Sequence, residues 1–166
     1  MLRPAVFLDR DGVINKDKEY IHKIDDFEWV EGAKESIKYL NNIGYYVFVA
    51  TNQSGIARGY YSERDVILLH EYINNELKKI NAFIDEFFFS PYHPDNTKEF
   101  LQLSHLRKPD TGMLDLAASK WPIDKSRSFL VGDKDTDIEC AEKFSIRGHL
   151  FKDGNLLDFI KLSENI

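Results

Sequence analysis

Four short apolar runs, each followed at once by polar or turn residues, set the pattern of this chain. They are rich in β-branched and aromatic residues, which favours buried strands. The runs cover residues 5–8, 45–50, 87–89 and 129–131, and a weaker fifth run covers 147–151. These segments are the predicted strands.

Between the runs, apolar residues recur every three or four positions, which is typical of amphipathic helices. One such pattern runs from Ala33 to Leu40 and stops at Gly44. A longer one follows Ser62, a favourable capping residue, and two more cover 113–120 and 137–144. The apolar stripe of the longer pattern is Val66, Leu69, Ile73, Leu77 and Ile80. Strands that alternate with helices predict an α/β fold with one doubly wound parallel sheet, Rossmann-like, and helices on both faces.

Composition narrows the class of protein. With 166 residues, the chain has the length of a single domain spanning 1–166. The net charge of -6, from 22 basic and 28 acidic residues, argues against a nucleic-acid or membrane-surface binder. A single cysteine, Cys140, excludes an internal disulfide and a thiolate metal cage. No apolar run approaches a membrane span. We therefore expect a soluble, cytoplasmic monomer that binds neither nucleic acid nor membrane.

Two carboxylates, Asp9 and Asp11, follow the first apolar run directly. Residues i and i+2 of a strand point to the same side, so this pair can converge on one pocket, and Gly12 lets the backbone turn away. Open α/β sheets bind their ligands at the carboxyl ends of the strands. The pair alone fits an acidic turn as well as it fits a site for a cation and an anion.

Three further polar groups stand at similar places. Thr51 and Asn52 follow the second run, Arg107 and Lys108 open the helix after the third, and the segment 132–137 follows the fourth. Each group alone is compatible with a turn or a solvated surface. Four such groups at the strand ends of one sheet favour an active site, walled by the loops 15–31 and 92–108.

These four groups resemble the motifs of the haloacid dehalogenase (HAD) superfamily of phosphatases. The matching segments are 9–12, 51–59, 107–114 and 132–137. Within the superfamily they resemble the group of histidinol-phosphate and D,D-heptose 1,7-bisphosphate phosphatases. The resemblance implies a HAD fold, and the short stretch between the first motif and the second strand predicts that it carries no cap domain.

The resemblance also implies a mechanism. Asp9 attacks phosphorus and forms an aspartyl-phosphate, while Asp11 protonates the leaving oxygen and later activates water. Mg²⁺ is the implied cofactor. Its implied ligands are the carboxylates of Asp9 and Asp133 and the backbone carbonyl of Asp11, and Asp137 would orient these ligands without binding the ion itself.

The remaining site residues are assigned to the substrate. Thr51 and Lys108 bind the phosphate oxygens and stabilise the transition state. Arg107 is the candidate for a distal charge or the sugar hydroxyls, because its guanidinium binds phosphate in two-pronged fashion. Asn52 and Lys134 are further candidates for substrate binding.

The implied substrate is a small phosphorylated sugar, D-glycero-D-manno-heptose 1,7-bisphosphate, which would lose its C7 phosphate during synthesis of the nucleotide-heptose precursors of lipopolysaccharide. Histidinol phosphate is the alternative. A phospho-accepting signalling domain is an alternative of another class, although Asp11 favours rapid turnover over a lasting phosphoprotein. A polynucleotide-end phosphatase has similar motifs, but the acidic balance of the chain argues against it.

One departure from the group concerns zinc. Relatives carry Cys and His ligands in a loop where this chain has Ser90, Tyr92, Ser104 and Leu106. None of these side chains is a zinc ligand, so we expect no structural zinc, and a site rebuilt from His93 and His105 is the less favoured alternative. Packing would then hold the loop, through one apolar cluster of Tyr92, Phe100, Leu103 and Leu106.

Overall fold

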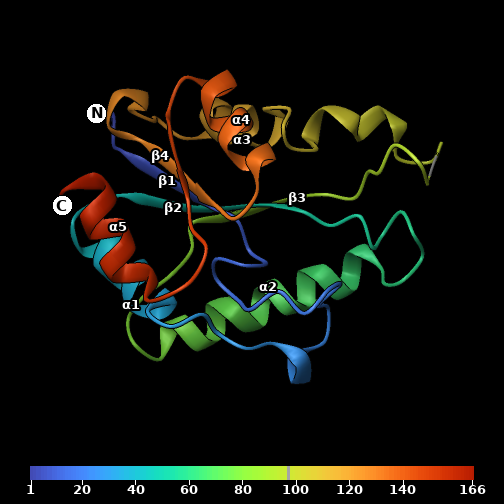
Figure 1. Cartoon of the computed structure of the whole chain (residues 1–166), viewed down its shortest axis with the longest axis horizontal. Coiled ribbons are helices and arrows are strands. Elements are labelled where there is room, and N and C mark those ends of the chain that lie inside the picture. The colour runs from blue at the N-terminus through green and yellow to red at the C-terminus, as the bar shows by residue number, and fades with distance from the viewer. Residues whose placement is uncertain (97) are drawn as a thin grey trace.

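Five parallel strands form the centre of the fold (Figure 1). They are β1 (Ala5–Leu8), β2 (Tyr46–Asn52), β3 (Glu86–Ser90), β4 (Phe129–Gly132) and β5 (Arg147–Leu150). Their order in the sheet is β3-β2-β1-β4-β5, so the carboxyl end of β1 lies between those of β2 and β4. This computed structural model describes residues 1–96 and 98–166.

Helices cover both faces of the sheet, as predicted. On one face lie α1 (Ala33–Asn42), α2 (Glu63–Lys78) and α5 (Leu156–Glu164), and on the other lie α3 (Gly112–Lys120) and α4 (Asp135–Phe144) (Figure 1). The described part of the chain also contains three short 3-10 helices: η1 (Ile24–Asp26), η2 (Leu101–Leu106) and η3 (Lys125–Arg127). Within the two described ranges, no helix is both long enough and apolar enough to cross a membrane.

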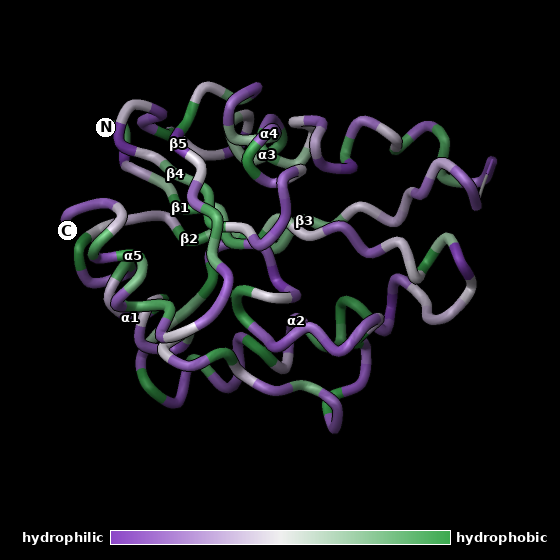
Figure 2. Tube along the Cα trace, viewed as in Figure 1, coloured by the Kyte–Doolittle hydropathy of each residue, from purple (hydrophilic) through white to green (hydrophobic). Residues whose placement is uncertain are grey.

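The strands are buried between two apolar cores. In β1, Val6 and Leu8 pack on the side of α1, α2 and α5, while Phe7 packs on the side of α3 and α4. Every residue of β1 is hydrophobic and fully buried, and this strand is green in Figure 2. Cys140 is buried in the core on the side of α3 and α4, where it is a packing residue.

Several element boundaries differ from the sequence prediction. β2 continues through Thr51 and Asn52, because these residues pair with Phe89 and Ser90 of β3. α4 begins at Asp135 instead of Asp137. α5 was not predicted from the sequence, and it begins where the side chain of Asn155 accepts hydrogen bonds from two backbone N–H groups.

The segment between β1 and α1 determines how open the molecule is. Residues 9–32 contain the short helix η1 and isolated β-bridges, and Asn15 bridges to Asp11 and to Trp29. This segment lies in loops and forms no separate cap domain, as expected.

Candidate active site

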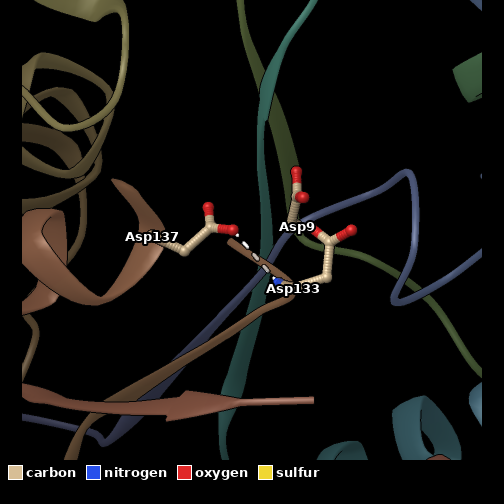
Figure 3. Close-up of side chains that lie close together, drawn as sticks. All are labelled: Asp9, Asp133 and Asp137. Carbon is tan, nitrogen blue, oxygen red and sulfur yellow. Dashed lines mark hydrogen bonds between the residues drawn. The ribbon is translucent and has the colours of Figure 1, made fainter. Parts of the chain in front are cut away.

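Acidic side chains from two neighbouring strand ends meet at one point of the sheet edge. Asp9 follows β1, and its backbone N–H donates to the carbonyl of Val131 in β4 at 3.0 Å. Asp133 follows β4 directly, and Asp137 lies in the first turn of α4. Figure 3 shows the three carboxylates gathered together, and they can present oxygen atoms within 4.8 Å of one another.

Lys108 lies beside this acidic group and is almost fully buried. Its Nζ lies 3.1 Å from Oδ1 of Asp9 and 2.6 Å from Oδ1 of Asp137, and it donates to the carbonyl of Ala50 at 2.7 Å. The side chain of Asn52 bonds to both backbone groups of Lys108, at 3.1 and 3.0 Å. The ammonium is therefore fixed relative to β2.

Burial and charge shift the pKa values of the central groups. Burial raises the pKa of Asp9 well above its usual value; Lys108 opposes this, while the neighbouring carboxylates add to it. Burial alone would lower the pKa of Lys108, but Asp9 and Asp137 outweigh it and raise that pKa. Burial also raises the pKa of Asp133. Three carboxylates face one ammonium, so a further cation is favoured here.

The remaining oxygen atoms indicate where that cation would bind. Asp137 is fully engaged, since its Oδ1 contacts Lys108 and its Oδ2 accepts from the backbone N–H groups of Asp133 and Lys134 at 3.1 Å each. Oδ1 of Asp133, in contrast, is buried and has no hydrogen-bond partner. Asp9 and Asp133 are thus suited to hold Mg²⁺, a cation that prefers oxygen ligands, and Asp137 orients them.

Gly12 allows the chain to pass close to this point. Its φ of 91° lies in the left-handed region, and a Cβ there would stand 2.2 Å from Oδ2 of Asp133. A side chain at this position would displace the carboxylate.

Asp11 lies at the edge of the acidic group. Its Oδ1 accepts from Arg10 Nη2 at 3.0 Å and from Asn15 Nδ2 at 3.0 Å, and its Oδ2 accepts from Gln53 Nε2 at 3.0 Å. Arg10 is fully buried and also donates to the carbonyl of Ile21 at 2.6 Å. Sequence reasoning missed this role of Arg10, although a basic residue between Asp9 and Asp11, just after a buried strand, was a signal for it.

Two adjoining pockets open at the site. The smaller, about 50 Å³, is lined by Asp9, Asp11, Asn52, Lys108, Lys134, Thr136 and Asp137. The larger, about 280 Å³, shares three of these residues and is lined by Asp11, Asp17, Glu19, Tyr20, Asn52, Gln53, Ser54, Tyr61 and Lys134. The small pocket offers Lys108, Lys134 and Asn52 as donors for a phosphate, while Thr51 is buried and lines neither pocket. The large pocket can accept the rest of a substrate.

The predicted substrate residues divide between two places. Asn52 and Lys134 line both pockets. Arg107 lies apart, where its Nη1 donates to the carbonyl of Tyr92 at 3.4 Å, and burial together with nearby Arg58 lowers its pKa. The first expected wall, 15–31, contributes three residues to the larger pocket.

The apolar residues of the loop 91–107 do not form the single cluster that we expected. Leu103 and Leu106 pack against the core beneath α3, whereas Phe100 packs against Ile56, Tyr61 and Val66. The three-residue repeat of η2 places Leu103 and Leu106 on one side of this helix, whereas Phe100 precedes η2 and does not follow that repeat.

One of the two histidines of this loop, His93, is engaged with the protein. One ring nitrogen of His93 lies 3.2 Å from Arg58 Nη2, and the other accepts from the backbone N–H of Asp95 at 3.2 Å. Over residues 1–96 and 98–166, the group of Asp9, Asp133 and Asp137 is the one cluster of three potential metal ligands.

Comparison with known proteins shows that the sequence is similar to phosphatases. The sequence model of the polynucleotide kinase 3 phosphatase family matches residues 5–155. A D-glycero-beta-D-manno-heptose-1,7-bisphosphate 7-phosphatase from Rhodopseudomonas palustris is 42% identical over 96% of this chain and 89% of its own. A D-glycero-alpha-D-manno-heptose-1,7-bisphosphate 7-phosphatase from Photorhabdus laumondii is 44% identical over 91% of this chain and 84% of its own.

Solved structures share the fold. A HAD-like phosphatase from Mesorhizobium loti superposes with a TM-score of 0.83 at 33% identity, covering 90% of this chain and 72% of its own. The D,D-heptose 1,7-bisphosphate phosphatase of B. bronchiseptica, complexed with magnesium and phosphate, has a TM-score of 0.79 at 28% identity, covering 96% and 86%. Since a family model and close relatives both cover most of the sequence, the chain belongs to the polynucleotide kinase 3 phosphatase family of HAD-fold phosphatases.

Proposed function

We propose that this protein is a Mg²⁺-dependent phosphomonoester hydrolase that removes the C7 phosphate of D-glycero-D-manno-heptose 1,7-bisphosphate. The observation that carries the proposal is the meeting of Asp9, Asp133 and Lys108 at the carboxyl edge of the sheet. The names of the two relatives above support the choice of substrate.

Binding of the phosphate must overcome repulsion. A carboxylate and a phosphate charge 4 Å apart repel by about 4 kcal/mol at an effective dielectric constant near 20. The ammonium of Lys108 and the hydroxyl of Thr51 offset this by contacting phosphate oxygens. Mg²⁺, held by Asp9 and Asp133, would supply further positive charge against those oxygens.

The reaction then proceeds in two displacements. A carboxylate oxygen of Asp9 attacks phosphorus, the bond from phosphorus to the C7 oxygen breaks, and Asp11 gives that oxygen a proton. In the second step Asp11 takes a proton from water, and the water oxygen attacks the phosphoryl group. Inorganic phosphate leaves, and Asp9 is regenerated.

The larger pocket suits a polyhydroxylated sugar. Asp17, Glu19 and Tyr20 supply groups for hydroxyl recognition, and Lys134 supplies a positive charge. We assign the distal phosphate to Arg107 if the loop 91–107 adjusts on binding. We also propose that the enzyme is a cytoplasmic monomer without structural zinc, in keeping with its single buried cysteine and its net charge of -6.

The test is a comparison of kcat/KM with Mg²⁺ for both anomers of heptose 1,7-bisphosphate, fructose 1,6-bisphosphate, histidinol phosphate and a 3′-phosphorylated oligonucleotide. We expect one heptose anomer to be preferred over every other class of substrate by more than about tenfold, or about 1.4 kcal/mol. Preference for histidinol phosphate or the oligonucleotide would contradict the substrate assignment.

Two variants and one trapping experiment test the chemistry. Asp9→Asn and Asp11→Asn should each abolish turnover while the fold is retained. A stoichiometric phosphoprotein that persists in the wild type would support a signalling domain instead.

A further inference from the structure

Gln53 connects two candidate catalytic residues, Asp11 and Thr51. It follows β2 directly, and its side chain is almost fully buried. Its Nε2 donates to Oδ2 of Asp11 at 3.0 Å and to Oγ1 of Thr51 at 2.8 Å. One amide group therefore contacts both the acid/base candidate and the hydroxyl assigned to phosphate binding.

The orientation of this amide is determined by its other neighbours. Its Oε1 accepts from the hydroxyl of Tyr61 at 2.6 Å and lies 3.5 Å from Arg10 Nη2. A guanidinium can only donate, so the oxygen of the amide must face Arg10 and the NH₂ group must face the site. Burial raises the pKa of Tyr61 to about 12, so its hydroxyl keeps its proton.

This orientation controls the hydroxyl of Thr51. Because Oγ1 of Thr51 accepts from Gln53, its own proton remains available for another acceptor. With the amide reversed, the hydroxyl would donate to Gln53 and its proton would be withdrawn from the phosphate. The amide thus keeps Thr51 as a donor.

The same amide holds one side of Asp11. Oδ1 of Asp11 is held by Arg10 and Asn15, and Oδ2 is held by Gln53 with a longer contact of 3.3 Å to Arg10 Nη2. Without Gln53, Oδ2 would lose its closest donor. Rotation of the carboxylate would then be less restricted.

We propose that Gln53 is a positioning residue that sets the proton direction of Thr51 and the angle of Asp11 together, and that Tyr61 fixes Gln53 for this task. The inference rests on the proposed phosphatase function. It predicts that a change at Gln53 slows proton transfer to the leaving group more than it slows the attack of Asp9 on phosphorus.

The experiment compares Gln53→Glu with wild type on two substrates. Gln53→Glu preserves the shape and replaces the donor with an acceptor. A sugar phosphate needs a proton on its leaving oxygen, whereas p-nitrophenolate leaves without one. The rate of the first turnover is measured for each substrate by rapid quench at saturating Mg²⁺.

We expect the first-turnover rate of Gln53→Glu on the sugar phosphate to fall about 100-fold or more. With p-nitrophenyl phosphate the loss should be at least about tenfold smaller. Tyr61→Phe keeps the ring and removes only the hydroxyl, and it should show the same pattern at about tenfold on the sugar phosphate.

Asn75→Asp is the control, because it makes the same change from amide to carboxylate at an exposed position of α2, outside the loops that surround the site. It should leave both rates unchanged. Thermal unfolding of each variant checks the fold, and Tyr61→Phe carries the test if Gln53→Glu does not fold.

The outcomes separate the two proposals. Equal losses on both substrates, or no loss in either variant, would overturn the positioning role while leaving the phosphatase function intact. A wild-type protein that hydrolyses neither substrate would overturn both.

Discussion

Replacement of Asp9 by asparagine should abolish turnover without destabilising the protein in the absence of metal. Asparagine keeps the shape and an oxygen that accepts from Lys108, but it cannot form an acyl phosphate. The charge of Asp9 is unfavourable in the folded state without metal, as the raised pKa indicates. Loss of that charge should therefore be neutral or stabilising.

The magnitude follows from the distances. The carboxylates of Asp9, Asp133 and Asp137 lie within 4.8 Å, so each pair repels by at least about 3.5 kcal/mol at an effective dielectric of about 20. The attraction between Lys108 Nζ and Asp9 Oδ1 at 3.1 Å stabilises the ionised Asp9 by about 5 kcal/mol. The net balance opposes an ionised Asp9 by about 2 kcal/mol, before the cost of burying it.

The assay is urea unfolding in EDTA and in Mg²⁺, together with steady-state kinetics. In EDTA, Asp9→Asn should match the wild type or exceed it by up to about 2 kcal/mol. At a Mg²⁺ concentration of about 100 times Kd, the wild type should gain about 2.7 kcal/mol, and the variant much less. An Asp9→Asn protein that is less stable than wild type in EDTA by more than about 1 kcal/mol, or that gains as much from Mg²⁺, would refute this electrostatic reasoning.

Further predictions concern neighbouring features. Lys108→Met should have the opposite effect on stability, costing about 3 to 5 kcal/mol in EDTA because buried carboxylates lose their cation, and kcat should fall by about 100-fold or more; equal stability of variant and wild type by urea unfolding would contradict this. His70 is buried against Arg10, which together with burial holds its pKa well below the usual 6.5. Between the pKa of His70 in the folded protein and the usual 6.5, the unfolded chain binds a proton that the folded protein lacks. The free energy of unfolding should therefore decrease as the pH falls below 6.5, by at most about 1.4 kcal/mol per pH unit. His70→Gln should show a shallower decrease over the same range, and an unchanged slope would exclude His70 as its source. Ser62→Ala, which removes the capping box of α2, should cost about 1 kcal/mol of stability with kcat unchanged; a change in kcat would argue against a purely structural role. Elemental analysis of the purified protein should find no stoichiometric zinc, and zinc that resists exchange with Mg²⁺ would show that expectation to be wrong.

The fold could be predicted from the sequence because its strands are buried on both faces. Such strands appear as continuous apolar runs, and all five predicted runs became strands. α5 could not be predicted in the same way, because its buried residues Leu156 and Ile160 form only a short apolar face near the end of the chain.

The acidic centre could also be predicted, since it depends on residues that leave neighbouring strands. Contacts between residues that are far apart in the sequence could not be predicted in this way. The spacing of His70 and His149 indicates no partner for either ring, and the structure shows that they contact Arg10 and Glu164, respectively. The double contact of Gln53 with Thr51 and Asp11 depends on Tyr61, whose position no local pattern reveals.

The reciprocal pairing of Asn52 with the backbone of Lys108 has a consequence for how such enzymes diversify. It holds the lysine from the sheet, independently of the intervening loop 91–107. Mutations, insertions or loss of a bound ion in that loop can therefore accumulate without displacing the catalytic cation. Recognition and chemistry can evolve as separate modules on the same scaffold, and the loop is the segment to exchange when a new specificity is engineered.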